Sequence, residues 1–66
     1  MTAQEIALDA FRFYKIEVIS VIENRIKLLG NYEIEIETNG LYKLYDDGFV
    51  VAPFNDINEL CRFILL

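Results

Sequence analysis

Hydrophobic residues recur with helical spacing over the first part of the chain. At 3.6 residues per turn, six apolar side chains fall within one narrow sector: Ala7, Phe11, Tyr14, Val18, Ile22 and Leu29. Polar side chains lie opposite: Glu5, Asp9, Arg12, Ser20, Glu23 and Lys27. This pattern predicts an amphipathic helix over residues 2–29, which ends at Gly30-Asn31.

A strand over residues 16–22 is the alternative, because this segment, I-E-V-I-S-V-I, is rich in β-branched side chains. We favour the helix. It would be roughly 40 Å long, which exceeds a sheet of short strands, so its end must overhang, kink near Ser20 or pack on another chain.

A hairpin follows. In residues 31–40, N-Y-E-I-E-I-E-T-N-G, polar and apolar side chains alternate with period two, which predicts a strand. A three-residue loop with left-handed Gly40 would pair Ile36 with Tyr42 and Glu35 with Lys43. We prefer it to a two-residue loop because it places opposite charges across from each other and keeps Ile34, Ile36, Tyr42 and Leu44 on one face.

The remaining pattern predicts a third strand and a second helix. Asp46-Asp47-Gly48 is a hairpin turn, residues 49–52 form the strand, and Pro53 ends it. A helix begins at Asn55 or Asp56, where D-I-N-E fits the acidic variant of a capping box. Its core face carries Ile57, Leu60, Cys61, Ile64 and Leu65. The fold class is α+β: helix, three-stranded antiparallel meander, helix (αβββα), with both helices on one face of the sheet.

Composition indicates a small cytoplasmic domain with more apolar side chains than its core can bury. Sixty-six residues make one domain (1–66), a single cysteine excludes an internal disulfide, and we expect no signal peptide or membrane span. Hydrophobic residues make up 55% of the chain, while so small a domain buries only about 60% of its unfolded surface. Ile6, Phe13 and Ile16 fall toward the polar side of the first helix, where they are either scattered exposed apolar residues or the interface of a homodimer.

The negative charge is concentrated in the middle of the chain. The net charge is −5; residues 1–29 are neutral, whereas residues 30–52 carry five acidic side chains and one basic one. An acidic protein is not expected to bind nucleic acid or anionic membranes directly. We therefore expect a protein partner with a basic surface.

The sequence offers little for catalysis. The absence of histidine removes the commonest general base and metal ligand, and Cys61 falls on the predicted core face of the last helix. Asp46 and Asp47 are explained by turn chemistry without a cation. We predict no enzyme, no catalytic residue, no metal and no cofactor.

Glu33, Glu35 and Glu37 share one strand face and have two interpretations. They are either the solvated face of a half-buried strand or a docking surface together with Leu41 and Tyr45 across the hairpin. We expect Lys43 on the same face to neutralise Glu35, which would leave Glu33 and Glu37 as the freer charges.

This acidic surface, the small size and the helix–meander–helix order resemble small acidic proteins that phages carry against bacterial defence, including some anti-CRISPR proteins. The resemblance covers the whole chain in architecture and charge and transfers no individual residue. It implies an inhibitor that blocks a basic, nucleic-acid-binding surface of a host protein. The alternative is a self-associating structural or regulatory module that dimerises through the long first helix.

Overall fold

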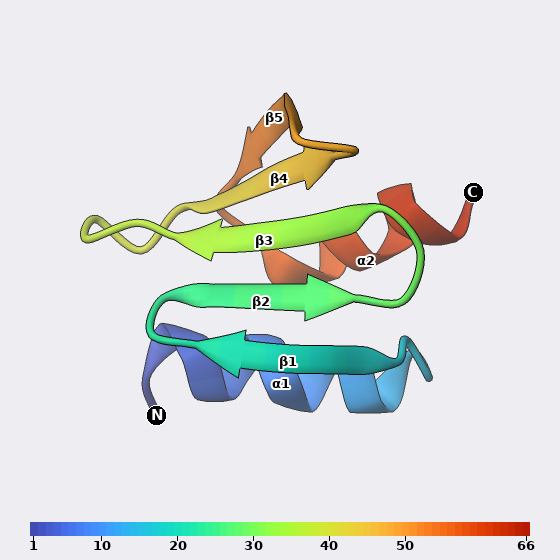
Figure 1. Cartoon of the computed structure of the whole chain (residues 1–66). Coiled ribbons are helices and arrows are strands. Elements are labelled where there is room, and N and C mark those ends of the chain that lie inside the picture. The colour runs from blue at the N-terminus through green and yellow to red at the C-terminus, as the bar shows by residue number, and fades with distance from the viewer.

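Five antiparallel strands form one sheet, and two helices cover one of its faces (Figure 1). The computed structural model describes all 66 residues. The elements are α1 (Ala3–Phe13), β1 (Val18–Ile22), β2 (Arg25–Leu28), β3 (Tyr32–Ile36), β4 (Tyr42–Asp46), β5 (Phe49–Phe54) and α2 (Ile57–Leu65). The α+β class and the second helix are as predicted, but the sheet has five strands and not three.

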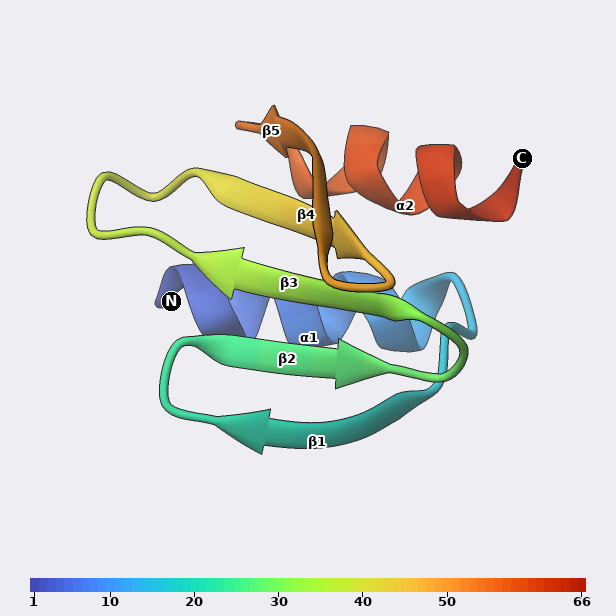
Figure 2. The ribbon, with the colours of Figure 1, turned by 45° about the horizontal axis from the view of Figure 1, so that its top comes forward.

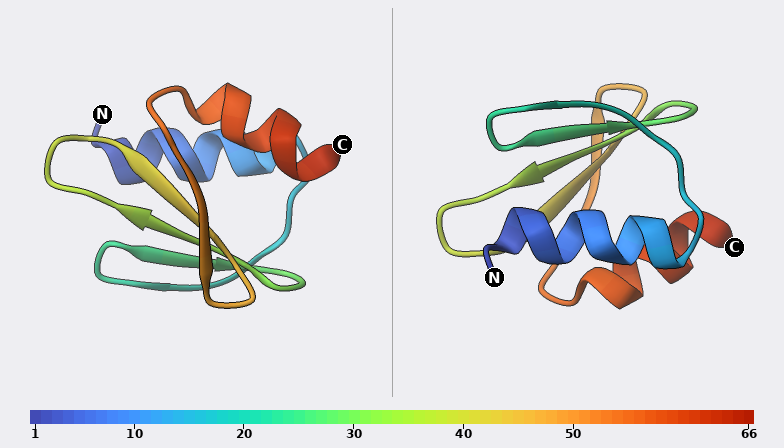
Figure 3. Two further views of the ribbon diagram at one scale, coloured as in Figure 1. Left: turned by 90° about the horizontal axis from the view of Figure 1, so that it is seen from above. Right: turned by 90° about the horizontal axis from the view of Figure 1, so that it is seen from below.

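The strands follow one another across the sheet in chain order, β1-β2-β3-β4-β5, so each pairs only with its neighbours in sequence. The sheet is strongly twisted, and β5 crosses the direction of β1 and β2 steeply (Figure 3). Both helices lie on the same side of the sheet in both views of that figure, as the sequence predicted.

The first helix is much shorter than predicted. Thr2 caps its start, where Thr2 Oγ1 accepts from Glu5 N and Glu5 Oε1 accepts from Thr2 N. At its end Lys15 is left-handed (φ 59°), and two hydrogen bonds, Lys15 N to Arg12 O and Ile16 N to Phe11 O, form a Schellman motif. The chain therefore turns at a position that carries no glycine.

The long-helix prediction is wrong, and the strand alternative over residues 16–22 is correct for its larger part. β1 and β2 form a hairpin joined by Glu23 and Asn24, with Glu23 at φ 54° and Ile22 paired with Arg25. The β-branched side chains of residues 18–22 suit a strand because they lose rotamer freedom in a helix.

The predicted register between β3 and β4 is confirmed. Ile36 pairs with Tyr42 and Glu35 with Lys43, and Gly40 at φ 86° closes the loop with a hydrogen bond to Glu37 O. The next turn is also as predicted: Asp47 (φ 54°) and Gly48 (φ 84°) are both left-handed, as a type I′ turn requires.

Pro53 does not end the last strand, contrary to the prediction. β5 continues to Phe54, and Pro53 lies opposite Lys43. A proline is tolerated here because β5 is an edge strand, whose outer side needs no donor to the ladder.

The second helix begins where the sequence predicted. Asp56 is its N-cap as predicted, but the predicted capping box with Glu59 does not form, because Asp56 Oδ1 accepts from Asn58 N at 2.9 Å instead. Ile57, Leu60 and Cys61 are buried, whereas Leu65 is exposed and does not belong to the core.

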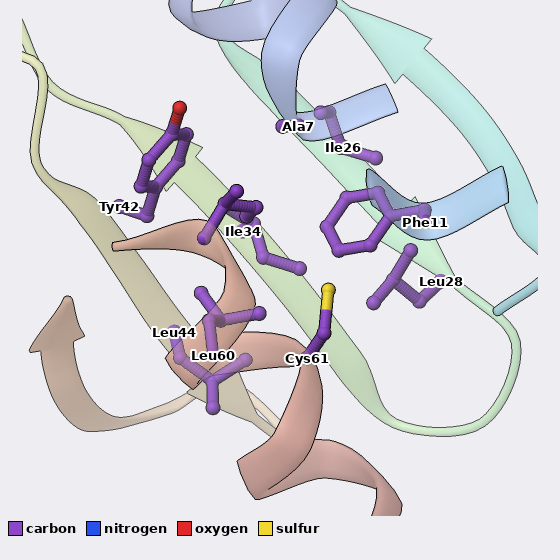
Figure 4. Packing of buried hydrophobic residues seen from close by; sticks show 10 residues of the cluster. Ala7, Phe11, Ile26, Leu28, Ile34, Tyr42, Leu44, Leu60 and Cys61 are labelled. Carbon is purple, nitrogen blue, oxygen red and sulfur yellow. The ribbon is translucent and has the colours of Figure 1, made fainter. Parts of the chain in front are cut away.

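Ten buried side chains form the core between the sheet and the helices (Figure 4). They are Ala7, Phe11, Ile26, Leu28, Ile34, Tyr42, Leu44, Ile57, Leu60 and Cys61. Of the predicted apolar sheet face, Ile34, Tyr42 and Leu44 are buried and Ile36 is half-buried. Tyr42 Oη donates to Ala3 O at 3.0 Å, which ties β4 to the start of α1. Neither helix is long and apolar enough to cross a membrane.

Candidate functional site: the uncovered face of the sheet

The second face of the sheet is covered by neither helix and faces the viewer in Figure 1. Side chains alternate along each strand, so the neighbours of the buried Ile26, Ile34 and Leu44 point to this open face. We define the open face by seven side chains of β2, β3 and β4 and of the loop that follows β3. They are Arg25, Lys27, Glu33, Glu35, Glu37, Lys43 and Tyr45.

Arg25 lies at the centre of a network of four side chains. Its guanidinium forms an ion pair and hydrogen bond with Glu33, and Arg25 Nη2 lies 3.6 Å from Glu35 Oε1. Tyr45 Oη donates to the same Glu35 oxygen at 2.8 Å, and the Arg25 guanidinium carbon lies 5.2 Å from the centre of the Tyr45 ring. One arginine therefore contacts two carboxylates and an aromatic ring.

The sequence-based prediction of which charges pair on this face is wrong. Lys43 lies opposite Glu35 in the register, but its ion pair is with Glu37, at 3.6 Å between Nζ and Oε2. Glu33 is paired with Arg25, so neither Glu33 nor Glu37 is the freer charge. With Lys27 directly across from Glu33, three bases face three carboxylates, and the open face as defined has no net charge.

The hydrogen bonds change the pKa values of the network. The hydrogen bond from Tyr45 is the main cause that lowers the pKa of Glu35, and Arg25 and Lys43 add to it. The same bond raises the pKa of Tyr45, and the bond to Glu33 raises the pKa of Arg25. Each shift favours the protonation state in which these bonds form: a charged Glu35, a neutral Tyr45 and a charged Arg25.

The structure brings the five predicted partner-binding residues into two neighbouring groups. Glu33, Glu35 and Tyr45 belong to the Arg25 network, in which Glu33 lies directly across from Tyr45. Glu37 and Leu41 lie at the loop between β3 and β4, where Glu37 N donates to Leu41 O. All five are half-buried, so the face is less freely solvated than a plain row of glutamates.

Two shallow depressions flank Lys27 and Glu33. One, of about 190 Å³, is lined by Ser20, Ile22, Arg25, Lys27 and Glu33. The other, of about 170 Å³, is lined by Lys27, Gly30, Asn31, Tyr32, Glu33, Asp47 and Gly48. Both are open and small compared with the roughly 300–1,000 Å³ of typical small-molecule sites.

Cys61 and the aspartates of the turn between β4 and β5 are the other groups that the sequence analysis considered for chemistry. Cys61 is fully buried, and burial raises the pKa of its thiol to about 11, far from a nucleophilic thiolate. No group of three or more His, Cys, Asp or Glu side chains is placed to hold a metal ion. Asp47 adopts the left-handed conformation of its turn, which accounts for an acidic residue there.

The predicted dimer interface on the first helix is not a single surface. Ile6 and Phe13 are exposed on α1, Phe13 with 77% of its surface, but Ile16 lies beyond the helix and packs against the core. Ile16 takes this position because it follows the left-handed Lys15 of the Schellman motif, where an apolar residue commonly folds back onto the helix.

Arg25 and Lys27 are the residues of this face that the sequence pattern missed. Both fell within the predicted long helix, Lys27 on its polar side, although R-I-K-L alternates with period two. That alternation, read together with the β-branched residues before it, is the signal that could have placed both on a strand.

Comparisons of the chain with protein-family models, curated proteins and solved structures give no significant match.

Proposed function

We propose that this protein is a non-enzymatic protein-binding module that docks on a basic protein surface through the open face of its sheet. The observation that carries the proposal is the row of Glu33, Glu35 and Glu37 on a face that no helix covers, with Tyr45 beside it. Tyrosine is enriched at the centres of protein interfaces, and Tyr45 lies beside this row and donates to Glu35.

The charge pairs on this face do not oppose such binding. Ion pairs near the protein surface contribute little to stability, so a carboxylate can exchange Arg25 or Lys43 for a basic side chain of a partner at small cost. The net charge of −5 attracts a basic partner over a longer range, and this attraction weakens with salt.

The partner class that fits is a host protein whose basic surface binds nucleic acid. Blocking that surface would make the protein an inhibitor of the kind that phages and other mobile elements carry against bacterial defence. The small size, the acidic charge and the α+β architecture support this finer proposal.

The test is affinity capture from cells of the source organism with three matched baits. The wild type is compared with Glu33→Gln/Glu35→Gln/Glu37→Gln, which removes the carboxylate charges, and with Arg25→Gln/Lys43→Gln, which removes two competing bases. We expect the partner to be retained by the wild type, lost by the first variant and retained more tightly by the second. Nucleic acid added as a competitor should release it.

Equal retention by all three baits would contradict docking through this face. A partner lost by the second variant as well would show that the ion pairs themselves are recognised and not the carboxylates alone. Circular dichroism of both variants checks that the fold is intact.

A further inference from the structure

The loop between β3 and β4 carries the one asparagine of the chain that is followed by glycine. Asn39 precedes Gly40, whereas the other asparagines precede arginine, tyrosine, aspartate and glutamate; they are Asn24, Asn31, Asn55 and Asn58. All five asparagines are exposed, so exposure does not distinguish them. Glycine leaves its backbone nitrogen unshielded because it has no Cβ. The residue that follows therefore makes Asn39 the most reactive asparagine of the chain.

This loop has little structure around it. It projects past the ends of the neighbouring strands at the left of Figure 2, and residues 38–40 are exposed. Apart from the adjoining residues, no heavy atom lies within 4 Å of the position that a Cβ of Gly40 would take. The loop can therefore change its conformation without disturbing the core.

Two hydrogen bonds hold the loop in place. Gly40 N donates to Glu37 O at 2.9 Å, and Leu41 N donates to Asn39 Oδ1 at 3.1 Å. None of these four residues is buried, so breaking both bonds does not require the protein to unfold. Once the bonds are broken, Gly40 N and Asn39 Cγ are free to approach each other.

We propose that Asn39 is a modification site, at which the side-chain amide is lost spontaneously with water as the only co-reactant. Gly40 N loses its proton and forms a bond to Asn39 Cγ, while the Cγ–Nδ2 bond breaks and releases ammonia. Water then opens the resulting five-membered imide. Attack at Cγ yields aspartate, and attack at the main-chain carbonyl carbon yields isoaspartate. Asparagine is one of the thermally labile residues of proteins for this kind of reason.

The two products affect the loop differently. In aspartate a carboxylate oxygen takes the place of Asn39 Oδ1 and still accepts from Leu41 N. In isoaspartate the main chain runs through the side-chain carbon, which adds a methylene group to the loop. Because loop length sets the register of β3 and β4, isoaspartate should destabilise the hairpin, whereas aspartate should leave it intact.

Both products add a negative charge to a part of the proposed docking surface. Glu37 and Leu41, the backbone partners of this loop, belong to that surface, and the chain already carries a net charge of −5. Additional negative charge strengthens the attraction of a basic partner. This consequence rests on the proposed function, whereas the modification itself does not.

The first test follows the wild-type protein by peptide mapping during several weeks in neutral buffer. Deamidation raises the mass of a peptide, whereas isomerisation at Asp47-Gly48 leaves it unchanged, so the mass reports asparagine alone. We expect Asn39 to react at least about tenfold faster than any other asparagine, because only its neighbour lacks a side chain. Higher pH should accelerate the reaction, since Gly40 N must lose its proton. Asn39→Ser, which keeps an acceptor for Leu41 N, is the matched control without the reacting amide.

A peptide of residues 33–45 serves as the reference for the loop without tertiary structure. The two hydrogen bonds should make the folded protein react about tenfold more slowly than this peptide. The proposal would be overturned by a wild-type protein that stays unmodified while the peptide is fully converted. Equal rates at Asn39 and Asn31 would also overturn it.

The second test separates the modification from its effect on docking. Asn39→Asp and Asn39→Ser join the wild type as baits in the affinity capture described above, and we expect the partner to leave Asn39→Asp only at higher salt. Equal elution from the two variants would rule out the effect on docking but not the modification. Failure of every bait to retain a partner would contradict the proposed function itself, while peptide mapping still decides whether Asn39 is modified.

Discussion

Arg25 determines the electrostatics of the open face. Its guanidinium contacts Glu33, Glu35 and the ring of Tyr45, and Tyr45 in turn donates to Glu35. Aligning three glutamates on one strand would otherwise cost repulsion, and these contacts with Arg25, together with the Lys43–Glu37 pair, offset it. At the scale of single residues the face is thus a set of matched charges with one tyrosine hydroxyl as the additional donor.

Removal of that donor should be visible in a titration. Because the bond from Tyr45 is the main cause that lowers the pKa of Glu35, Tyr45→Phe should raise this pKa toward its ordinary value of 4.5. Arg25 and Lys43 remain, so the return should be incomplete. Carbon-detected NMR of the Glu35 carboxyl group measures the change.

The same variant has a definite effect on the pH dependence of stability. A lowered carboxyl pKa stabilises the fold above the ordinary value of 4.5, and this contribution is lost as the pH falls through the lowered value. Tyr45→Phe should therefore be less stable than the wild type at neutral pH, and the difference should shrink in acid. Tyr32→Phe, which removes a hydroxyl on the same sheet away from the network, should leave the Glu35 pKa unchanged; an equal shift would argue against the hydrogen bond as its cause.

At the scale of elements, the end of α1 decides the fold. The Schellman motif at Lys15 and Ile16 releases the next twelve residues, 17–28, to form a hairpin. That hairpin places Arg25 and Lys27 beside β3. The neutral open face is thus a consequence of where one helix stops.

Glycine at position 15 should stabilise the protein. A left-handed conformation costs a residue with a side chain roughly 1–2 kcal/mol, and glycine avoids this cost. Glycine also gives the unfolded chain more conformational freedom, which offsets part of the stabilisation. We expect Lys15→Gly to raise the free energy of unfolding in urea by about 0.5–1 kcal/mol. Arg12→Gly, inside α1, should lower it by about 1 kcal/mol. If both substitutions destabilise alike, α1 continues beyond Phe13.

Local signals explain which elements the sequence predicted. The Asp47-Gly48 turn, the register set by Gly40 and the Asp56 cap each depend on a few neighbouring residues with specific backbone preferences, and all three were predicted correctly. The end of α1 was missed because its left-handed residue is lysine, which gives no signal.

The hairpin of β1 and β2 was missed for a different reason. Val18 and Ile22 are four residues apart, which fits one face of a helix as well as alternate positions of a strand. Pairing with β3, a tertiary effect, decides between the two. The glutamate row was therefore found from the sequence, but its charge partner Arg25 was not.

At the scale of the whole molecule, one small core holds every element. Ten buried residues join both helices to the sheet, and Cys61 of α2 points toward Phe11 of α1 (Figure 4). With so few buried residues, no element has a core of its own. The chain should unfold as a single cooperative unit, which makes the buried thiol a reporter of global unfolding.

The reactivity of Cys61 measures this cooperativity. The side chain is fully buried and its thiol pKa is raised to about 11, so a thiol reagent should modify it only after the core opens. At roughly 0.05–0.15 kcal/mol per residue, a domain of this size should be stable enough to slow modification at least a hundredfold relative to the unfolded chain. Increasing urea should accelerate modification. The free energy of opening calculated from these rates should fall with urea concentration as steeply as the free energy of unfolding measured by circular dichroism. If Cys61 reacts as fast without urea as in the unfolded chain, α2 detaches from the sheet on its own, and the two layers do not form one cooperative unit.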